Sequence, residues 1–453
     1  MNKLAIVVGL LALASQGAST AQEAAGRGSA APKVVLIIGD GMDQHQITIA
    51  RDYIAGYDGR LTLDTLSVRS SVQIQTVAEE NPSMPEYVAD SANTATSMAT
   101  GIVTSAGRIA TTAGTDLDVP TIMDTAAAAG FGTGIVTTSS VTDATPASFV
   151  AHVSYRLCES PRAMAGSCPA DLAANGGKGS IAEQIAASRI DIVLGGGERY
   201  FAQAAEGGEK SVRDLAAAKG FRVIGTAAEL ASLKPGGKVL GLFAPGTMPV
   251  QWRGAGGAQA QRVQHDENGR VVLPEPFACE PDPAYGATPP LTAMARAAFA
   301  QLDGRPFVLM IESASIDKQS HVRRPCGQIG ELKQLDDTLK LVLEYAAAHP
   351  ETLVLVTADH SQAAQLVPET SWLAGMNAAS PGYFARIRTP EGAIMGVNYA
   401  TNDSELQEDH TGADVPLLAS GPGANEIPAT VRQTDIFHIM LRHLGLEAPS
   451  TSP

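Results

Sequence analysis

Short continuous apolar runs recur along the chain. The first is Lys33–Ile38, which ends at the polar turn Gly39-Asp40-Gly41. A run without regular polar alternation is typical of a strand in a sheet that is covered on both faces. Similar runs follow at Gly134–Thr138, Ile190–Leu194, Phe307–Ile311, Thr352–Thr357 and Val415–Ala419.

Segments with helical periodicity lie between these runs. They are Gln46–Ile54, Pro120–Ala129, Leu291–Leu302, Gln328–Ala348 and Thr434–Leu444. The alternation predicts an α/β fold, a three-layer sandwich with a large, mostly parallel central sheet flanked by helices. Gly- and Pro-rich stretches near 156–290 and 363–400 are expected to be loop-rich insertions on a single domain at 33–450.

The N-terminal residues have a different pattern. A short basic start is followed by an apolar run from Leu4 to Ala14 and by the small residues Ser19-Thr20-Ala21. This order predicts a signal peptide at 1–21, followed by a flexible leader at 22–32. The apolar run is too short to cross a bilayer as a helix. We therefore expect a periplasmic or secreted protein without a membrane anchor.

Composition narrows the range of partners. The 453 residues are 44% hydrophobic and carry a net charge of −15. The hydrophobic content is ample for a large core. The negative charge argues against a nucleic-acid-binding surface or an anionic membrane as a partner. An anionic substrate would need a local positive site, because the overall field repels it.

The four cysteines are Cys158, Cys168, Cys279 and Cys326. An even number in an exported chain is consistent with two disulfides, for which the sequence allows three pairings. The short loop between Cys158 and Cys168 favours sequential pairing. Their spacing does not match a zinc knuckle, so we assign none of them to metal.

One polar stretch with small residues begins at Asp90-Ser91-Ala92. It follows a segment with proline and glutamate, so we expect Ser91 at or near the N-terminus of a helix. Free N–H groups and the helix dipole favour negative charge there, and a serine in that place could attack an anion. The alternative is that Asp90 or Ser91 only caps the helix.

Candidate ligands for metal ions stand just after several predicted strands. These residues are Asp40, Asp143, Thr145, Glu312, Asp317, His321, Asp359 and His360. In open α/β sheets, ligands bind beyond the carboxyl ends of the strands. Each residue alone could be an ordinary turn or surface residue. Together they predict a metal site, in which imidazole and carboxylate favour zinc and oxygen ligands favour magnesium.

Two spacings add geometry. Asp317 and His321 are four residues apart, so on a helical turn they share a face and can bind one ion. Asp359 and His360 are adjacent and can both bind metal only in a turn beyond the strand. His410, in Asp409-His410-Thr411-Gly412, offers a further imidazole.

In combination these motifs resemble the alkaline phosphatases, most closely the bacterial periplasmic form. The resemblance runs from about Val34 to Leu446. It rests on six motifs: Gly39-Asp40-Gly41-Met42, Asp90-Ser91-Ala92, Asp143-Ala144-Thr145-Pro146, Glu312 through Asp317-Lys318 to His321, Thr357-Ala358-Asp359-His360, and His410-Thr411-Gly412.

The resemblance implies hydrolysis of phosphate monoesters, over a broad substrate range, through a phosphoserine on Ser91. It implies two zinc ions and one magnesium ion, and usually a homodimer. One zinc would be bound by Asp317, His321 and His410, the second by Asp40, Asp359, His360 and Ser91, and magnesium by Asp40, Thr145 and Glu312. Arg156 matches the arginine that binds the substrate phosphate. Asp143 and Lys318 would hold waters on magnesium and orient phosphate.

The chain also departs from the family pattern. Gln362 stands where relatives commonly have a histidine that contacts a zinc ligand, and Ser320 replaces an acid found in some relatives. Asp43 is a polar addition, and we expect the nearby His45 on a helix surface. Three rival functions remain: a sulfatase, although the residues after Ser91 lack its Pro and Arg, a phosphodiesterase, and a secreted metal- or phosphate-binding protein without turnover.

Overall fold

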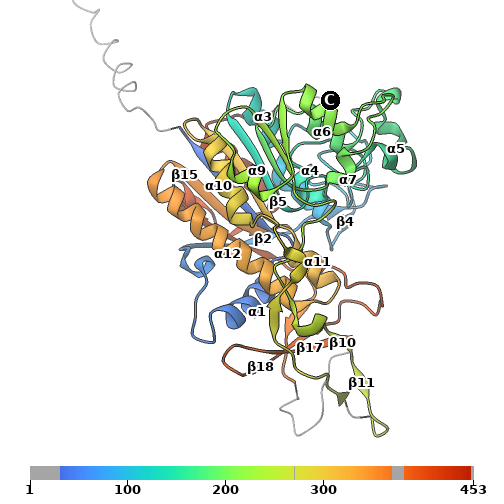
Figure 1. Cartoon of the computed structure of the whole chain (residues 1–453), viewed down its shortest axis with the longest axis vertical. Helices are drawn as coiled ribbons and strands as arrows, with labels where there is room; N and C mark the ends of the chain where they lie inside the picture. Colours follow the sequence, from blue (N-terminus) through green and yellow to red (C-terminus); the bar gives the residue numbers. More distant parts are fainter. Residues whose placement is uncertain (1–30, 270, 370–381, 450–453) are drawn as a thin grey trace, which may run out of the picture.

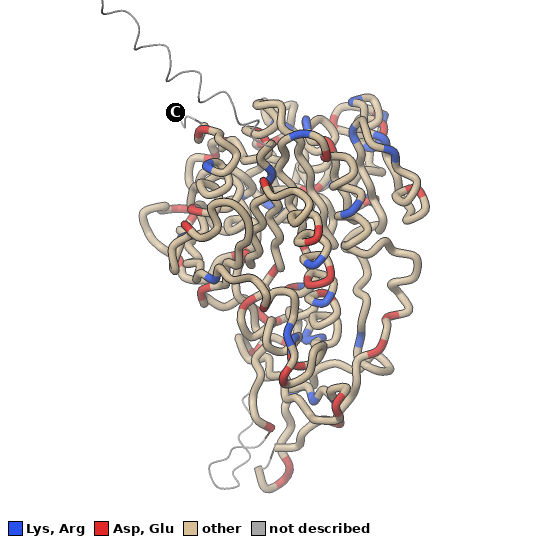
Figure 2. The backbone as a smooth tube through the Cα atoms, turned by 90° about the vertical axis from the view of Figure 1, so that its left-hand side faces the viewer, with Lys and Arg blue, Asp and Glu red and all other residues tan. Residues whose placement is uncertain are grey.

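The computed structural model describes residues 31–269, 271–369 and 382–449. The predicted signal peptide at 1–21 lies outside the described residues, as does nearly all of the expected leader. Within the described part, no helix has the length and apolar character needed to cross a membrane. Figure 2 shows acidic and basic positions interspersed along the backbone.

A ten-stranded sheet forms the centre of the described chain. Its order is β20-β2-β19-β15-β1-β14-β5-β6-β8-β7. The strands are β1 Lys33–Gly39, β2 Val68–Gln73, β5 Gly132–Ser140, β6 Ile192–Gly196, β7 Phe221–Ile224, β8 Lys238–Leu242, β14 Phe307–Ser313, β15 Thr352–Ala358, β19 Val415–Ser420 and β20 Thr430–Arg432. All neighbours pair in parallel except β19, which is antiparallel to both β15 and β2. The predicted mostly parallel sheet is confirmed.

Strand β1 lies between β14 and β15, and every one of its residues is buried. This complete burial explains its unbroken apolar sequence, because neither face of the strand meets water. β14 and β15 are buried along their whole length in the same way. The three strands form the hydrophobic centre of the molecule, and they end at the same edge.

Helices cover both faces of the sheet. On one face lie α1 Gln44–Ile54, α10 Leu291–Leu302 and α12 Pro325–Ala348, of which Figure 1 shows α10 and α12 crossing the front. On the other lie α2 Ser91–Thr100, α3 Ile122–Ala128 and α13 Gln433–Leu444. This arrangement confirms the three-layer sandwich. Each expected helix is present, with ends shifted by a few residues at most.

The two regions expected as loop-rich insertions, near 156–290 and 363–400, contribute to different parts of the structure. The first part of 156–290 supplies β6, β7 and β8 to the central sheet. Its second part contains β9 Trp252–Gly254, β13 Cys279–Pro281 and β10 Gln261–Arg262. β10 joins β16 Ala364–Leu366, β17 Tyr383–Arg388 and β18 Ile394–Tyr399 in a small antiparallel sheet, at the lower end of Figure 1. The small sheet therefore combines segments of both regions.

Candidate active site

The central strands bring candidate ligands to one edge of the sheet. Gly39 pairs with Ser313 on one side and with Ala358 on the other. Asp40, Glu312 and Asp359 therefore lie at nearly the same level, although they are far apart in the sequence. The backbone N–H of Asp40 donates to the carbonyl oxygen of Ser313 at 3.1 Å, which holds the turn after β1 against β14.

Asp40, Asp359 and His360 form the first ligand group, and their ligating atoms lie within 4.8 Å of one another. His360 Nε2 is 3.4 Å from Asp40 Oδ1 and 3.5 Å from Asp359 Oδ2. All three side chains are buried. Asp40 Oδ1 and Asp359 Oδ2 have no hydrogen-bond partner among the described residues. Because a buried carboxylate oxygen without a partner is costly, these atoms fit a divalent cation.

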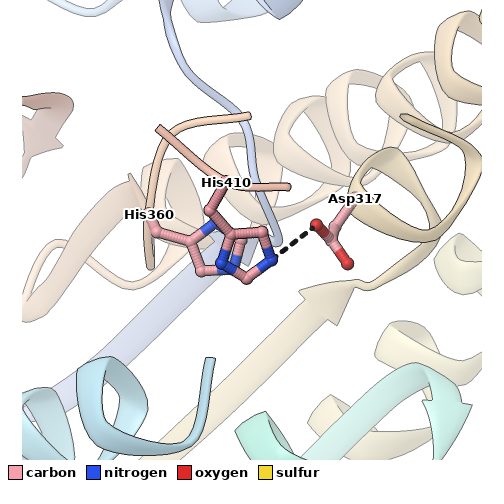
Figure 3. A group of neighbouring side chains, drawn as sticks. All are labelled: Asp317, His360 and His410. Atoms are coloured by element: carbon pink, nitrogen blue, oxygen red, sulfur yellow. Dashed lines mark ion pairs between the residues drawn. The ribbon is translucent and has the colours of Figure 1, made fainter. Parts of the chain in front are cut away.

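The second ligand group contains Asp317, His321 and His410. Asp317 Oδ1 is 3.2 Å from His321 Nε2 and 3.5 Å from His410 Nε2, and the two nitrogens are 3.1 Å apart. Figure 3 shows Asp317 directed at His410, with the His360 ring stacked on that of His410. The spacing of Asp317 and His321 on α11 Ser315–His321 therefore brings both to one point, as the four-residue interval predicts.

Backbone carbonyl groups orient the imidazole rings of this second group. His410 Nδ1 is 2.8 Å from the carbonyl oxygen of Ala89, and His321 Nδ1 is 2.5 Å from that of Glu408. With Nδ1–H donating to a carbonyl, Nε2 is left as the lone-pair nitrogen that can bind a metal. The two carbonyl contacts therefore direct Nε2 of each ring toward Asp317, where it could bind a metal ion.

Glu312 and Thr145 lie next to the first group. Glu312 is buried, and its Oε2 accepts hydrogen bonds from Thr137 Oγ1 and from Ser139 Oγ, the latter at 3.3 Å. Thr145, in α4 Ala144–Ala147, has a buried hydroxyl oxygen without a hydrogen-bond partner in the described chain. Burial raises the pKa of the Glu312 carboxyl group, and the nearby Thr145 hydroxyl offsets a small part of this rise. A set of oxygen donors of this kind suits magnesium.

The buried carboxylates are electrostatically unfavourable without cations. Burial, together with the nearby charges of Asp317 and Asp359, raises the pKa of Asp40 well above its ordinary value. Burial also raises the pKa of Glu312 to about 7. We refer to Asp40, Asp359 and Glu312 as the acidic interior. The open oxygens of Asp40 and Asp359 and the raised pKa values of Asp40 and Glu312 indicate that these residues fit bound metal ions.

Ser91 is the first residue of α2, and all ten residues of that helix are buried. Asp90 caps the helix: its side chain accepts from Asn93 N at 3.1 Å, and Asn93 Oδ1 accepts from Asp90 N at 3.0 Å. Ser91 Oγ lies 3.1 Å from His360 Nε2. The capping function therefore belongs to Asp90, and the Ser91 hydroxyl faces the first ligand group.

Two basic side chains are paired with the carboxylates of Asp90, the residue before Ser91, and of Asp143. Arg156 donates from one terminal nitrogen to Asp90 Oδ2 at 3.1 Å and from the other to Asp143 Oδ1 at 3.2 Å. Lys318 Nζ is 2.6 Å from Asp143 Oδ2. Although burial opposes ionisation, Lys318 and Arg156 hold the pKa of Asp143 far below its usual range. We refer to Asp90, Asp143, Arg156 and Lys318 as the charged rim.

Comparison with known protein families identifies the family to which this chain belongs. A family model described as alkaline phosphatase matches residues 31–404. This chain belongs to the alkaline phosphatase family. Streptomycin-6-phosphate phosphatase of Streptomyces griseus is 41% identical over 96% of this chain and 95% of its own. Alkaline phosphatase of Escherichia coli is 38% identical over 92% of this chain and 87% of its own.

A solved structure supports the fold. Alkaline phosphatase from the Antarctic bacterium TAB5 superposes with a TM-score of 0.67 over 92% of this chain and 99% of its own, at 24% identity. Family membership makes this chain a phosphomonoesterase, an enzyme that depends on metal ions. Among the described residues, two groups have the distances needed to hold such an ion: Asp40, Asp359 and His360, and Asp317, His360 and His410.

Both disulfides of this alkaline phosphatase link neighbours in the cysteine order. Cys158 is bonded to Cys168, and Cys279 to Cys326, so the predicted sequential pairing is confirmed. The first bond closes a loop that starts two residues after Arg156. The second joins β13 to the first turn of α12, shortly after His321.

The residues that depart from the family pattern can be described by their contacts and exposure in the structure. Gln362 Nε2 donates to Asp317 Oδ1, so the glutamine contacts this proposed zinc ligand through its amide group. Ser320 is buried and donates to the carbonyl oxygen of Ile316 at 2.8 Å and to Gln328 Oε1 at 3.1 Å. His45 is exposed on α1, as expected.

Sequence reasoning missed one supporting residue at the far end of the chain. Gln433, the first residue of α13, is buried and donates from Nε2 to the backbone carbonyl oxygen of Asp359 at 2.7 Å. It orients the segment that carries Asp359 and His360. A lone glutamine at a helix start gives no sequence signal for this role, because the contact spans a sequence separation of 74 residues.

Proposed function

We propose that this enzyme hydrolyses phosphate monoesters through a covalent phosphoserine on Ser91, using two zinc ions and one magnesium ion. The observation that carries the proposal is the position of the Ser91 hydroxyl. It lies 3.1 Å from His360 Nε2, at the buried N-terminus of α2, between the acidic interior and the charged rim. Broad specificity for small monoesters is part of the proposal.

The proposed ligand sets follow the geometry of the donors. Asp317, His321 and His410 would hold one zinc, and Asp40, Asp359, His360 and Ser91 the other; Asp40, Thr145 and Glu312 would hold magnesium. Bound zinc and magnesium supply Lewis-acid stabilisation of oxygen anions and lower the pKa of a coordinated hydroxyl group. His360 is prepared for binding, because burial lowers its pKa and favours the neutral imidazole.

Ser91 performs the covalent step. Its Oγ forms a bond to phosphorus, the bond between phosphorus and the alcohol oxygen breaks, and the serine proton is passed on to the departing alcohol. The N–H groups at the start of α2 stabilise negative charge on the phosphoryl group. In the second step a water oxygen bonds to phosphorus, the bond to Ser91 Oγ breaks, a proton from that water returns to Ser91 Oγ, and inorganic phosphate leaves.

The charged rim positions the phosphate. Arg156 offers two donors in one plane, which match two phosphate oxygens. Asp90 and Asp143 hold the guanidinium group in place through its two terminal nitrogens. Lys318, held by the same Asp143, adds positive charge next to it. The two cations and two carboxylates make the rim electrically neutral, so it offers phosphate oriented donors without adding to the net charge of −15.

Export and dimerisation are further parts of the proposal. The apolar N-terminal run supports cleavage after Ala21 and a periplasmic or secreted location. Two disulfides support the same location, because such bonds persist in oxidising compartments. A homodimer rests on family resemblance alone.

A second substrate candidate comes from one relative. The streptomycin-6-phosphate phosphatase matches nearly the full length of both chains at 41% identity. Streptomycin 6-phosphate should therefore be assayed beside a simple chromogenic monoester. A preference of more than tenfold in kcat/KM for the antibiotic ester would replace broad specificity by this narrower function.

The deciding experiment is an assay on a chromogenic phosphate monoester with protein as isolated, after chelation, and after return of zinc and magnesium. We expect activity to disappear with chelator and to return fully only with both ions. A chromogenic phosphodiester serves as the comparison substrate. Diester turnover above monoester turnover would favour the phosphodiesterase alternative, and bound zinc without any turnover would favour a binding protein.

A further inference from the structure

Asp43 is a buried carboxylate that neither the family resemblance nor the proposed mechanism uses. It follows the turn that carries Asp40, and it caps α1. Its Oδ1 accepts from the backbone N–H groups of His45 at 2.7 Å and Gln46 at 3.1 Å. This is the usual function of an N-cap, which serine fulfils equally well. Capping therefore explains one of the two carboxylate oxygens.

The second oxygen of Asp43 reaches a distant segment. Asp43 Oδ2 accepts from Ser361 Oγ and from the backbone N–H of Gln362, the latter at 3.2 Å. Ser361 and Gln362 come directly after His360 in the sequence. The contact therefore ties the turn with Asp40 to the turn with Asp359 and His360, across a sequence separation of 318 residues.

The same contacts extend to a third segment. Thr411 Oγ1 donates to Ser361 Oγ at 2.7 Å, and Thr411 N donates to the carbonyl oxygen of Ser361 at 3.2 Å. Thr411 follows His410 directly. Gln362, held by Asp43 through its backbone, donates from its side chain to Asp317. Asp43, Ser361 and Thr411 thus form a hydrogen-bonded chain that joins the segments of both proposed zinc sites.

We propose that Asp43 and Ser361 are positioning residues that hold the metal-binding segments in register, so that zinc affinity depends on them. The inference rests on the proposed function. The ligands come from separate segments, and their carboxylates repel one another without metal. Hydrogen bonds that hold these segments together before metal arrives reduce the ordering that binding requires.

Two variants test the chain of contacts. Asp43→Ser keeps a capping oxygen for α1 but is too short to reach Ser361. Ser361→Ala removes the hydroxyl group that lies between Asp43 and Thr411. Losing supporting contacts of this kind typically lowers metal affinity by about 10- to 100-fold. We expect a loss in that range for Asp43→Ser and a smaller loss for Ser361→Ala, measured by zinc titration of metal-free protein against a competing chelator.

A control and two further readouts separate positioning from general damage. Ser71→Ala removes another long-range hydrogen bond from a serine to a carboxylate, Ser71 Oγ to Asp414 Oδ2 at 2.8 Å, which touches no proposed ligand. It should leave zinc affinity unchanged. The urea midpoint of metal-free Ser361→Ala should stay close to that of the wild type. At saturating zinc, KM of both variants should match the wild type.

The outcomes are distinguishable. Wild-type zinc affinity in both Asp43→Ser and Ser361→Ala overturns the inference and leaves the proposed function standing. If Asp43→Ser fails to fold, Ser361→Ala and Thr411→Val decide, and unchanged affinity in those two variants also overturns it. A wild-type chain that binds no zinc overturns the proposed function, and the inference falls with it.

Discussion

The acidic interior and the charged rim lie next to each other, but their carboxylates differ in pairing and in pKa. In the rim, Asp143 is paired with both Lys318 and Arg156, and its pKa is held low. In the interior, Asp40 has a raised pKa and an oxygen without a partner in the described chain. In the rim, basic side chains of the protein neutralise the carboxylates. Among the described residues, the carboxylates of the interior lack such partners and fit bound cations instead.

The division separates two tasks. In the proposed mechanism, cations bound in the interior would serve the reacting oxygen atoms, while Arg156 and Lys318 of the rim would bind the phosphate of each new substrate molecule. Ser91 stands where the two meet. Variants in each region should therefore affect different measurements, and that separation is open to test.

Ser91→Ala gives the largest expected effect. Removing the nucleophile should lower kcat by about 1,000-fold or more and abolish the trapped phosphoenzyme. Zinc content and phosphate affinity should persist, because the interior and the rim are intact. Ser97→Ala, in the same buried helix, removes only a hydrogen bond to the Asn93 carbonyl oxygen and should keep its activity. Unchanged turnover in Ser91→Ala would remove the role given to Ser91.

Arg156→Ala should have the second largest effect, confined to the rim. We expect kcat/KM to fall about 100-fold, with weaker inhibition by inorganic phosphate and unchanged zinc content. Arg156→Lys should recover part of the loss, since lysine keeps the charge but not the planar pair of donors. Arg162→Ala, an exposed arginine of the neighbouring disulfide loop, is the control. A loss of zinc in Arg156→Ala would break the proposed separation.

Glu312→Gln and Asp143→Asn should change the stability of metal-free protein in opposite directions. At pH 8 Glu312 is ionised in the folded chain, although burial raises its pKa to about 7. The free-energy cost of ionising this buried group destabilises the folded state. Glu312→Gln removes this cost, and the gain should shrink as the pH falls below 7 and vanish below the ordinary pKa of 4.5, where the carboxyl group is protonated in both states. Asp143 has a lowered pKa, so its ionised form stabilises the folded state and Asp143→Asn loses that contribution.

The expected changes at pH 8 are on the order of 1–3 kcal/mol in the free energy of unfolding, as a gain for Glu312→Gln and a loss for Asp143→Asn. Urea unfolding in the presence of chelator measures both. Changes of the same sign in the two variants would contradict the contrast between interior and rim.

Gln362→His should have the smallest effect. Because the glutamine amide already donates to Asp317, exchange for an imidazole donor should change zinc affinity by less than about threefold. Leucine has similar bulk to glutamine but no hydrogen-bond donor, so Gln362→Leu should bind zinc more weakly than both the wild type and Gln362→His. Equal affinity in Gln362→Leu would mean that this contact does not orient Asp317. Competition with a chelator measures all three affinities.

The sequence predicts the central strands and helices well because their signals are local. β1, β14 and β15 are buried on both faces, so each appears as an unbroken apolar run. Their parallel arrangement places the residues that follow them at one edge, and the candidate site was therefore predictable as a cluster. The pairing partners were not, since nothing in Val415–Ala419 marks β19 as antiparallel.

Contacts that depend on the backbone of distant loops could not be predicted. The carbonyl oxygens of Ala89 and Glu408 orient two imidazole rings, but every residue type has a carbonyl group. The small sheet likewise joins β10 to β17, whose residues lie more than a hundred positions apart. From the sequence, Asp43 is only an additional acidic residue. Its contact with Ser361 could not be predicted, because the two residues come together only in the folded chain.

The place of β1 in the sheet has a consequence for how the chain folds during synthesis. Among the described strands, β1 is synthesised first, and its neighbours β14 and β15 begin at Phe307 and Thr352. The apolar segment Val34–Ile38 must therefore stay unpaired until most of the polypeptide exists. Such long-range parallel pairing is slow and leaves apolar segments exposed to aggregation. The pairings that assemble the catalytic edge are thus among the long-range steps of folding.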